Sequence, residues 1–482
     1  MIIPFDKSKY DYSTEEILKN ITGSRLLSAE IEFNRSCNYL CPYCYAAGNS
    51  DHAQLDPAVA TDAIRQVHAL GAKKIVVLGG EPLLCKQLKA NIELITGELG
   101  MGAEIFTNGA LINEDWAKFF FEHGCRVVVK LNSLRPEVQE RLTGVPNALD
   151  KAFHAIRVLK DAGFDSEMLV ASSVISAENE QEVAELWKYL RRNGIKPYLE
   201  IMTPQGRLLE NRDLEVHPRR LKEIFDEIAA FDNANGYDWE PQPPLVGSKC
   251  LRHLYSCVIG ATGNVTPCVG LTEVLGNIYE RKLSDILGTS VVLRKLKDFR
   301  NTIKGPCKTC EKADSCYGCR GAVYQLTGDY LASDPLCWKN CDTLLDQPYP
   351  LPCDAQQWLP HRPPMTMVDE LIEFGEWTKV TARIKPDNRF LRDGVLDNEA
   401  LPEIVAQACA VMTGFERNNH DLSGFLTGLR SIRFLHPVRN GDLLILQLHE
   451  SGHVDNYHTL DFKAVLEDGT LCAEGELSIC EI

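Results

Sequence analysis

The sequence has no apolar stretch that approaches the roughly 18–20 consecutive residues needed for a membrane-spanning helix. Its amino terminus, MIIPFDKSKYDYSTEEILKN, has neither a basic leader with an apolar core nor a cleavage site. Basic residues are in deficit, with 51 Lys and Arg against 67 Asp and Glu, and the net charge of −16 disfavours duplex nucleic acid or an anionic membrane as the main partner. We therefore expect a cytoplasmic protein with no membrane span and no nucleic-acid partner.

Cysteine, in contrast, is abundant, with 18 residues in a chain of 482. Disulfides are rare in a reducing compartment, so ligation of a metal or an iron–sulfur cluster is the favoured role for the cysteines. Their spacing should show which kind of site they form. The length exceeds what one ordinary core can organise, and two to four domains are expected.

Between Ala29 and about Thr203, short β-rich runs alternate with amphipathic helical patterns. The expected strands are 29–33 and runs beginning at 74, 103, 126, 166 and 197, and helical patterns lie between them, as at 56–70 and 178–194. This alternation predicts a parallel sheet with right-handed crossovers, and six units fit a partial barrel. The carboxyl ends of such strands usually carry the chemistry, and a cysteine triplet, GGEP, TNG and KLNS all fall there.

The triplet is Cys37, Cys41 and Cys44, with the spacing C-x3-C-x2-C. Three thiolates on one loop can hold three irons of a cubane cluster and leave the fourth iron open to an exogenous chelate. The alternative is a zinc knuckle completed by His52, since structural zinc takes four ligands.

With Tyr43 before the last cysteine and GGEP at residues 79–82, the sequence resembles the radical S-adenosylmethionine (SAM) enzymes. The resemblance implies that the open iron binds the amino and carboxylate groups of SAM. Reduction of the cluster would then give a 5′-deoxyadenosyl radical that abstracts hydrogen from a substrate. It also implies that Tyr43, Gly79, Gly80, Glu81 and Pro82 belong to the cofactor site. The triplet and GGEP on consecutive strand ends disfavour the zinc alternative.

Later strand ends resemble the family's nucleoside shelf. The resemblance implies cofactor contacts from Asn108 in TNG and from Lys130, Asn132 and Ser133, where relatives more often carry Ser-Leu-Asp-Gly. Arg141 stands where some relatives direct an arginine at the SAM carboxylate, a role that suits the paired donors of a guanidinium. A solvated charge on a helix is the alternative for Arg141.

A second field of cysteines follows residue 249. Its members are Cys250, Cys257, Cys268, Cys307, Cys310, Cys316, Cys319 and Cys337. Paired C-x2-C spacings also suit two structural zincs, but GNVTPC and CYGCRGAVYQLTGDYLASDPLC resemble the SPASM extension of radical SAM enzymes. The resemblance implies two auxiliary 4Fe–4S clusters. The nearer would use Cys250, Cys257, Cys268 and Cys319, and the farther Cys307, Cys310, Cys316 and Cys337. The remaining cysteines are expected to be mostly small buried hydrophobes, although Cys341 and Cys353 could substitute as ligands.

The final 120 or so residues combine one helical pattern with alternating strands, which predicts an α+β domain. LPHRPPMTMVDELIEF and EIVAQACAVMTG resemble the hotdog-fold 3-hydroxyacyl carrier-protein dehydratases over roughly 355–482. The resemblance implies a helix wrapped by an antiparallel sheet, pairing of hotdog domains in a homodimer or heterodimer, and Glu403 as the catalytic carboxylate. FLRDGVLD replaces the usual GHFPG histidine segment, which leaves His361 as the candidate base. A carrier-binding or dimerising module is the alternative.

Together these patterns predict five parts of the chain: an amino-terminal extension (1–25), a partial (β/α)6 barrel radical SAM core (26–245), a small SPASM domain (246–345), a linker (346–357) and a hotdog dehydratase-like domain (358–482). The expected activity is that of a radical SAM oxidoreductase. The fusion makes an acyl thioester on an acyl carrier protein the candidate substrate. Reduction of the cluster calls for a reducing partner such as flavodoxin or ferredoxin. A peptide-modifying maturase, of the ribosomal-peptide or sulfatase type, and an iron–sulfur electron carrier or scaffold are the alternatives.

Overall fold

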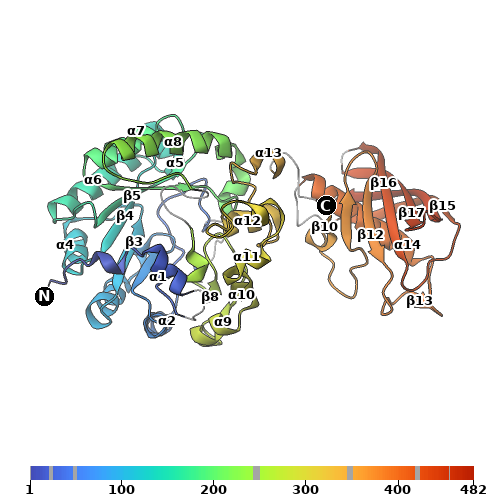
Figure 1. Cartoon of the computed structure of the whole chain (residues 1–482), viewed down its shortest axis with the longest axis horizontal. Coiled ribbons are helices and arrows are strands. Elements are labelled where there is room, and N and C mark those ends of the chain that lie inside the picture. Colours follow the sequence, from blue (N-terminus) through green and yellow to red (C-terminus); the bar gives the residue numbers. More distant parts are fainter. Residues whose placement is uncertain are drawn as a thin grey trace. The chain divides into compact units, whose positions relative to one another are not determined.

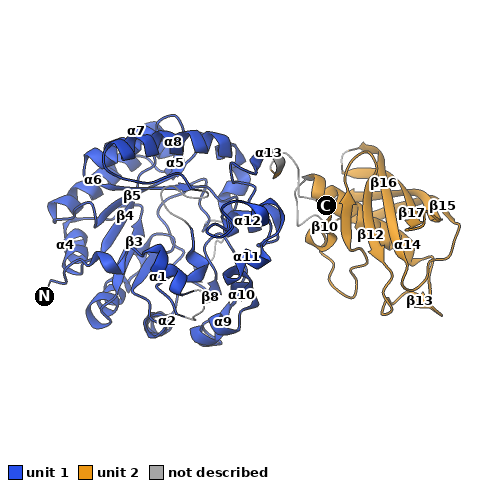
Figure 2. Cartoon of the chain, viewed as in Figure 1, with its two compact units in different colours: residues 1–342 blue, residues 343–482 orange. Residues whose placement is uncertain are grey.

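The computed structural model describes residues 2–20, 25–46, 52–242, 250–344, 351–417, 424–454 and 456–481. The chain forms two compact units, residues 1–342 and 343–482, and each is described by itself (Figure 2). Each unit has an extensive apolar core of its own. Within the described ranges, no helix is both long enough and apolar enough to cross a membrane.

The first unit is built on one curved sheet with helices along its outer face (Figure 1). Six parallel strands lie in chain order: β1 (Ser28–Glu32), β2 (Lys74–Leu78), β3 (Gly102–Thr107), β4 (Arg126–Lys130), β5 (Leu169–Ile175) and β6 (Lys196–Ile201). β7 (Val258–Ile259) pairs in parallel with β1, and β8 (Asn264–Thr266) and β9 (Gly276–Asn277) continue the sheet in antiparallel. The predicted partial barrel is confirmed.

Most helices of this unit bury apolar residues in the cores around the sheet. Before the cysteine-rich stretch the helices are α1 (Thr14–Lys19), α2 (Pro57–Ala69), α3 (Leu88–Ile92), α4 (Glu114–Glu122), α5 (Pro136–Thr143), α6 (Ala148–Asp161), α7 (Val183–Arg192) and α8 (Pro218–Ala234). In α2, the Asp56 side chain caps the N–H of Ala58 at 2.8 Å, as expected for a helix that begins with proline. The pattern from residue 178 becomes helical only at Val183, because the Asn179 side chain holds a turn by accepting from the N–H of Ser176.

The cysteine-rich stretch after residue 249 has little regular structure. Its helices are short: α9 (Leu283–Thr289), α10 (Val291–Lys297), α11 (Phe299–Thr302), α12 (Arg320–Thr327) and α13 (Cys341–Leu344). Its two apolar clusters hold only a few fully buried residues each. A segment with so small a core depends on other constraints for stability, which agrees with a domain organised by its cysteines.

The second unit wraps an antiparallel sheet around α14 (Ala400–Arg417). In sheet order the strands are β10 (Cys353–Asp354), β11 (Glu370–Glu373), β12 (Thr378–Arg383), β16 (Leu443–Val454), β17 (Tyr457–Leu466), β18 (Leu471–Glu481) and β15 (Gly424–Phe434). A separate ribbon pairs β13 (Leu391–Arg392) with β14 (Val395–Leu396). The apolar stripe of α14 is buried at Leu401, Ile404, Val405, Ala408 and Met412. The predicted helix wrapped by an antiparallel sheet is therefore confirmed.

The predicted linker overlaps folded structure. Residues 353–354 form β10, and η8 (Ala355–Trp358) begins inside the same stretch, with Trp358 fully buried. Residues 346–350 lie outside the described residues.

Candidate active site

The three cysteines that follow β1 lie close enough to influence one another. Burial raises the pKa of Cys41 to about 12, and the neighbouring thiols of Cys44 and Cys37 add to the shift. The N–H of Tyr39 points at Cys37 Sγ, 3.4 Å away. The structure thus gathers the predicted triplet on one loop, whereas His52, the fourth ligand of the zinc alternative, is exposed.

The glycines of GGEP bring the end of β2 against the backbone that precedes Cys37. Gly80 N donates to Asn34 O at 2.9 Å. A Cβ at position 80 would lie 2.2 Å from Ser36 O, and one at position 79 would lie 2.3 Å from Asn34 O. Gly79 also has a φ of +139°, which a side chain would strain. Only glycine permits this approach, which fixes where the cysteine loop begins.

Two further segments hold the loop. Leu40 N donates to Thr143 O, at the end of α5, at 3.0 Å. On the other side, Arg207 N in η4 (Gly206–Glu210) donates to Cys44 O at 3.2 Å. The loop is therefore fixed from three directions before any cofactor binds.

Glu81 of GGEP, a predicted cofactor residue, has a side chain that the fold itself uses. It is fully buried, and Oε1 accepts from Thr107 Oγ1 at 2.7 Å and from Leu83 N at 3.1 Å. Oε2 accepts from Asn108 N at 2.8 Å, and the Asn108 amide donates to Asn38 Oδ1 at 2.7 Å. Burial raises the pKa of Glu81 while these donors oppose the rise. The carboxylate joins the ends of β2 and β3, and Pro82, also buried, begins the next turn.

The end of β4 carries two more predicted cofactor residues. Asn132 is fully buried; its Nδ2 donates to Tyr43 OH at 2.8 Å and its Oδ1 accepts from Val174 N at 3.1 Å. Lys130 Nζ lies 5.6 Å from the centre of the Tyr43 ring. Burial lowers the pKa of Lys130, and the charge of Glu200 opposes this. Asn132 therefore positions Tyr43 beside the cysteines, and the Lys130 side chain lies near the same ring.

The other two predicted cofactor residues have partners within the protein. Ser133 is fully buried and donates to Glu182. Arg141 lies at the surface and forms an ion pair with Glu178. Neither partner could be predicted from the sequence, because both come from the turns after β5.

Three cysteines predicted for the nearer auxiliary cluster interact electrostatically. Burial raises the pKa of Cys268 to about 12 and raises that of Cys319, and Cys250 adds to both shifts. Backbone N–H groups point at Cys268 Sγ (3.3 Å, from Leu271) and at Cys319 Sγ (3.4 Å, from Ala322). The fourth predicted ligand, Cys257, is fully buried within the apolar core of the barrel.

The cysteines predicted for the farther cluster form a second group. Burial raises the pKa of Cys337 to about 12, with contributions from Asp334, Cys307 and Cys316. Backbone N–H groups point at each of three sulfurs: Asp334 N at Cys307 (3.5 Å), Lys312 N at Cys310 (3.5 Å) and Gly318 N at Cys316 (3.4 Å).

The cysteine sulfurs, with backbone N–H groups directed at them, fit the ligation of iron–sulfur clusters. N–H groups directed at sulfur are the interactions that stabilise thiolate ligands and tune cluster potentials. The structure has no disulfide among its 18 cysteines, all of which are described. Within the described ranges, no three His, Cys, Asp or Glu side chains are grouped as the ligands of a metal ion.

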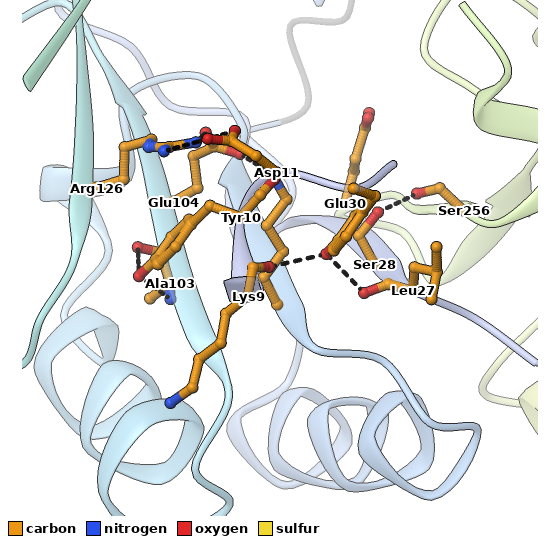
Figure 3. A network of polar contacts seen from close by, with 12 residues as sticks. Lys9, Tyr10, Asp11, Leu27, Ser28, Glu30, Ala103, Glu104, Arg126 and Ser256 are labelled. Atoms are coloured by element: carbon orange, nitrogen blue, oxygen red, sulfur yellow. Dashed lines mark hydrogen bonds and ion pairs between the residues drawn. The ribbon is translucent and has the colours of Figure 1, made fainter. Parts of the chain in front are cut away.

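The first unit has a partly open cavity of about 790 Å³ between its strands and its amino-terminal segment. Much of its wall is charged. Arg126 donates to both oxygens of Asp11 at 2.9 and 3.1 Å, as Figure 3 shows, and Arg252 pairs with the buried Glu30. Although burial opposes it, Arg126 holds the pKa of Asp11 at about 2. None of the cysteines and none of the predicted cofactor residues lines this cavity.

The amino-terminal segment closes the cavity at the beginnings of the strands. Tyr10 OH donates to Gly124 O at 2.7 Å and accepts from Ala103 N at 3.1 Å. Tyr12 OH donates to Leu27 O at 2.8 Å. These bonds satisfy backbone groups just before or within β1, β3 and β4, so the segment is part of the barrel's structure.

In the second unit, the two predicted catalytic residues are neighbours. His361 Nε2 lies 3.8 Å from Glu403 Oε1, and both side chains are more than a third exposed. Gln407, 1% exposed, donates to Glu403 Oε1 and to Met365 O at 2.9 Å each. Its Oε1 accepts from Met367 N at 2.9 Å. One amide thus ties the segment that carries His361 to the helix that carries Glu403.

Comparison with known families agrees with this geometry. The model of the radical SAM superfamily matches residues 31–190, that of the iron–sulfur cluster-binding SPASM domain matches 250–311, and that of ApeP dehydratase matches 353–482. The chain carries a radical SAM domain, a SPASM domain and an ApeP-like dehydratase domain. As a radical SAM protein with a SPASM domain, it binds SAM and 4Fe–4S clusters.

Individual relatives of the radical SAM and SPASM domains are distant. The AdoMet-dependent heme synthase of Methanosarcina barkeri is 25% identical over 342 residues, which is 64% of this chain and 94% of the relative. The PqqA peptide cyclase of Gluconobacter oxydans is 24% identical over 335 residues, 64% of this chain and 90% of the relative. Streptococcus suis SuiB bound to S-adenosylmethionine has a TM-score of 0.54 at 16% identity, covering 67% of this chain and 80% of SuiB. This structural likeness concerns the fold.

Proposed function

We propose that the protein is a radical SAM oxidoreductase that abstracts a hydrogen atom from a substrate held in the barrel. The observation that carries this proposal is the fixed loop of Cys37, Cys41 and Cys44, gathered at the carboxyl edge of the sheet against Gly79 and Gly80. Three thiols on one loop leave one iron for SAM. Electron carriers need no such vacancy, so radical chemistry is favoured over the carrier or scaffold alternative.

When bound, the cluster and SAM together supply the 5′-deoxyadenosyl radical. The residues of this chain position those groups. Lys130 faces the cysteines, where its charge suits the SAM carboxylate or ribose, and Asn132 holds Tyr43 in place. A flavodoxin or ferredoxin in the cytoplasm would supply the electron.

We assign the second unit to an acyl thioester on a carrier protein. Dehydration of a 3-hydroxyacyl group needs a base for the α-proton and an acid for the departing hydroxyl. His361 and Glu403 lie within reach of each other and of solvent, so they can share these roles. A module that only binds the carrier, or that only dimerises, would not require the pair.

A peptide-modifying maturase is the second candidate. One relative is named a PqqA peptide cyclase, and one structural neighbour is SuiB bound to its precursor peptide SuiA.

The first experiment tests radical chemistry. Anaerobically reconstituted protein, reduced with dithionite and given SAM, should form 5′-deoxyadenosine, and the Cys41→Ala variant should not. Wild-type protein that keeps its clusters and forms no 5′-deoxyadenosine would favour the electron-carrier alternative.

The second experiment separates the substrates. The protein is incubated with SAM, reductant and a carrier protein bearing a 3-hydroxyacyl chain, and the carrier is analysed by mass spectrometry. Loss of water from the carrier-bound chain without SAM would show dehydratase activity of the second unit. A SAM-dependent loss of hydrogen would show radical chemistry of the first unit. An unchanged carrier in both conditions would favour the peptide-modifying maturase.

A further inference from the structure

Arg320 is a buried cation in the cysteine-rich segment. It follows Cys319 directly, begins α12 and is 1% exposed. One of its nitrogens, Nη1, donates to Tyr330 O at 3.0 Å and to Ala332 O at 2.7 Å. Its Nε and Nη2 are buried and have no hydrogen-bond partner among the described residues. Burial of a guanidinium with unused donors is costly unless an anion compensates the charge.

The nearest carboxylate does not supply that compensation by direct pairing. Asp334 is fully buried, but its Oδ2 accepts from Cys319 N at 2.7 Å and its Oδ1 from Leu336 N at 2.9 Å. Within the described ranges, no ion pair shorter than 4.0 Å joins Arg320 to a carboxylate. Asp334 interacts with Arg320 only at longer range.

The charge of Arg320 acts on both groups of cysteines. It interacts electrostatically with Cys319, predicted for the nearer cluster, and with Cys307, predicted for the farther one. The backbone around Asp334 links the same two groups. Asp334 N points at Cys307 Sγ, 3.5 Å away, while the Asp334 side chain accepts from the N–H of Cys319. Arg320 and Asp334 therefore lie at the junction of the two ligand sets.

A glycine permits this packing. Gly318 has a φ of +66°, and a Cβ there would lie 3.0 Å from Arg320 Nη2 and 2.6 Å from Asp334 Cβ. Residue 318 thus packs tightly against both side chains, and the guanidinium is kept from water. A charge kept from water acts at longer range and more strongly than an exposed one.

We propose that Arg320 is the shared counter-charge of the two auxiliary clusters and raises the reduction potential of both. A 4Fe–4S cluster bound by four thiolates is an anion, and each one-electron reduction makes it more negative. A fixed cation beside the ligands favours the reduced form. The proposal goes beyond the proposed function because it depends on cluster binding alone and makes no reference to the substrate.

The test compares Arg320→Gln, which removes the charge, with Arg320→Lys, which keeps it. Both reconstituted full-length proteins are titrated with dithionite while the clusters are followed by electron paramagnetic resonance. We expect Arg320→Gln to lower the midpoint potentials of both auxiliary clusters and to leave that of the amino-terminal cluster unchanged. We expect Arg320→Lys to retain most of the wild-type potentials. Arg300→Gln is the matched control, because Arg300 is exposed in the same segment.

Three results would overturn the proposal: unchanged potentials in Arg320→Gln at wild-type iron content, equal shifts in the Lys and Gln variants, or a shift confined to one auxiliary cluster. If Arg320→Gln fails to hold the clusters, the iron and sulfide contents of the two variants are compared instead. Retention by Arg320→Lys supports the charge, and loss in both variants overturns its role. Formation of 5′-deoxyadenosine is measured separately, so failure of the proposed radical chemistry would leave this result readable.

Discussion

His361 Nε2 and Glu403 Oε1 lie 3.8 Å apart, although the two residues come from separate segments of the second unit. Gln407 creates this proximity, because its amide bonds to Glu403 and to the backbone of Met365 and Met367. A base and an acid held this close can divide the proton transfers of a dehydration.

Replacing Glu403 by glutamine removes the acid and keeps its shape. We expect Glu403→Gln to slow dehydration of a carrier-bound 3-hydroxyacyl chain by about 10²-fold or more, as is typical for loss of a general acid or base. Mass spectrometry of the carrier over time measures the rate. Glu399→Gln, at an exposed carboxylate just before α14, is the control. Equal rates in wild type and Glu403→Gln would remove Glu403 from the mechanism.

Gln407→Leu should loosen the segment that carries His361. The substitution leaves Met367 N, Met365 O and the Glu403 carboxylate without their partner, and each buried unsatisfied group costs about 1–3 kcal/mol. We expect faster hydrogen exchange at residues 359–367 and unchanged exchange in β17. Unaltered exchange at Met367 would contradict the described role of Gln407.

Gly80→Ala should disrupt the amino-terminal cluster. The new methyl group would lie 2.2 Å from Ser36 O, so the cysteine loop must move. We expect loss of the iron bound by Cys37, Cys41 and Cys44, seen in iron analysis and in loss of 5′-deoxyadenosine formation. Gly97→Ala is the matched control, because nothing lies within 4 Å of its Cβ position. Normal iron content in Gly80→Ala would show that the loop tolerates displacement.

His253 should make the first unit sensitive to acid. Burial, together with the charges of Arg320 and Arg252, lowers the pKa of His253 from 6.5 to about 3. The unfolded chain binds a proton below pH 6.5 while the folded protein does not. The stability contributed by this group is therefore complete above pH 6.5 and is lost as the pH falls towards 3, at about 1.4 kcal/mol per pH unit.

Chemical denaturation of the reconstituted protein between pH 8 and pH 5.5 measures this effect. We expect His253→Gln to be less stable than wild type at pH 8, because it disturbs the contact with Tyr317 OH. The variant should also lose less stability on acidification. Parallel pH profiles for the two proteins would show that His253 titrates normally.

The β15 edge should mediate self-association. β15 is the last strand of its sheet and exposes several apolar side chains, among them Phe425, Leu426 and Leu429. An exposed apolar edge strand of this kind is normally paired or covered. We expect a homodimer by light scattering and a monomer for Leu429→Glu, with Val291→Glu in the first unit as the control. A monomeric wild-type chain would contradict a homodimer and leave a different chain as the partner.

The sequence was sufficient to predict features that depend on local pattern. The six strands and the apolar stripe of α14 follow from periodicity, and the cysteine triplet from spacing. The uses of Glu81, Asn132 and Ser133 could not be predicted, because their partners Thr107, Val174 and Glu182 are distant in sequence. In the sequence, a polar residue at a strand end gives the same pattern whether its side chain contacts a ligand or other residues of the protein.

Buried charges were equally hidden from the sequence. Arg320 follows a cysteine, and nothing in CYGCRG shows that its guanidinium lacks a pairing carboxylate. Glu30 offered a weak signal, because a carboxylate in the middle of a buried strand needs a cavity or a cation to face. Only the fold shows that Arg252 is that cation.

The contact of Gly79 and Gly80 with residues 34–36 has a consequence for protein engineering. The turn after β2 and the cysteine loop share one set of backbone contacts, so neither can be exchanged alone. A chimera that imports the loop from another protein would need the matching turn from the same donor. The two stretches, more than forty residues apart in the chain, would have to be exchanged together, with the backbone contacts to Thr143 and Arg207 preserved.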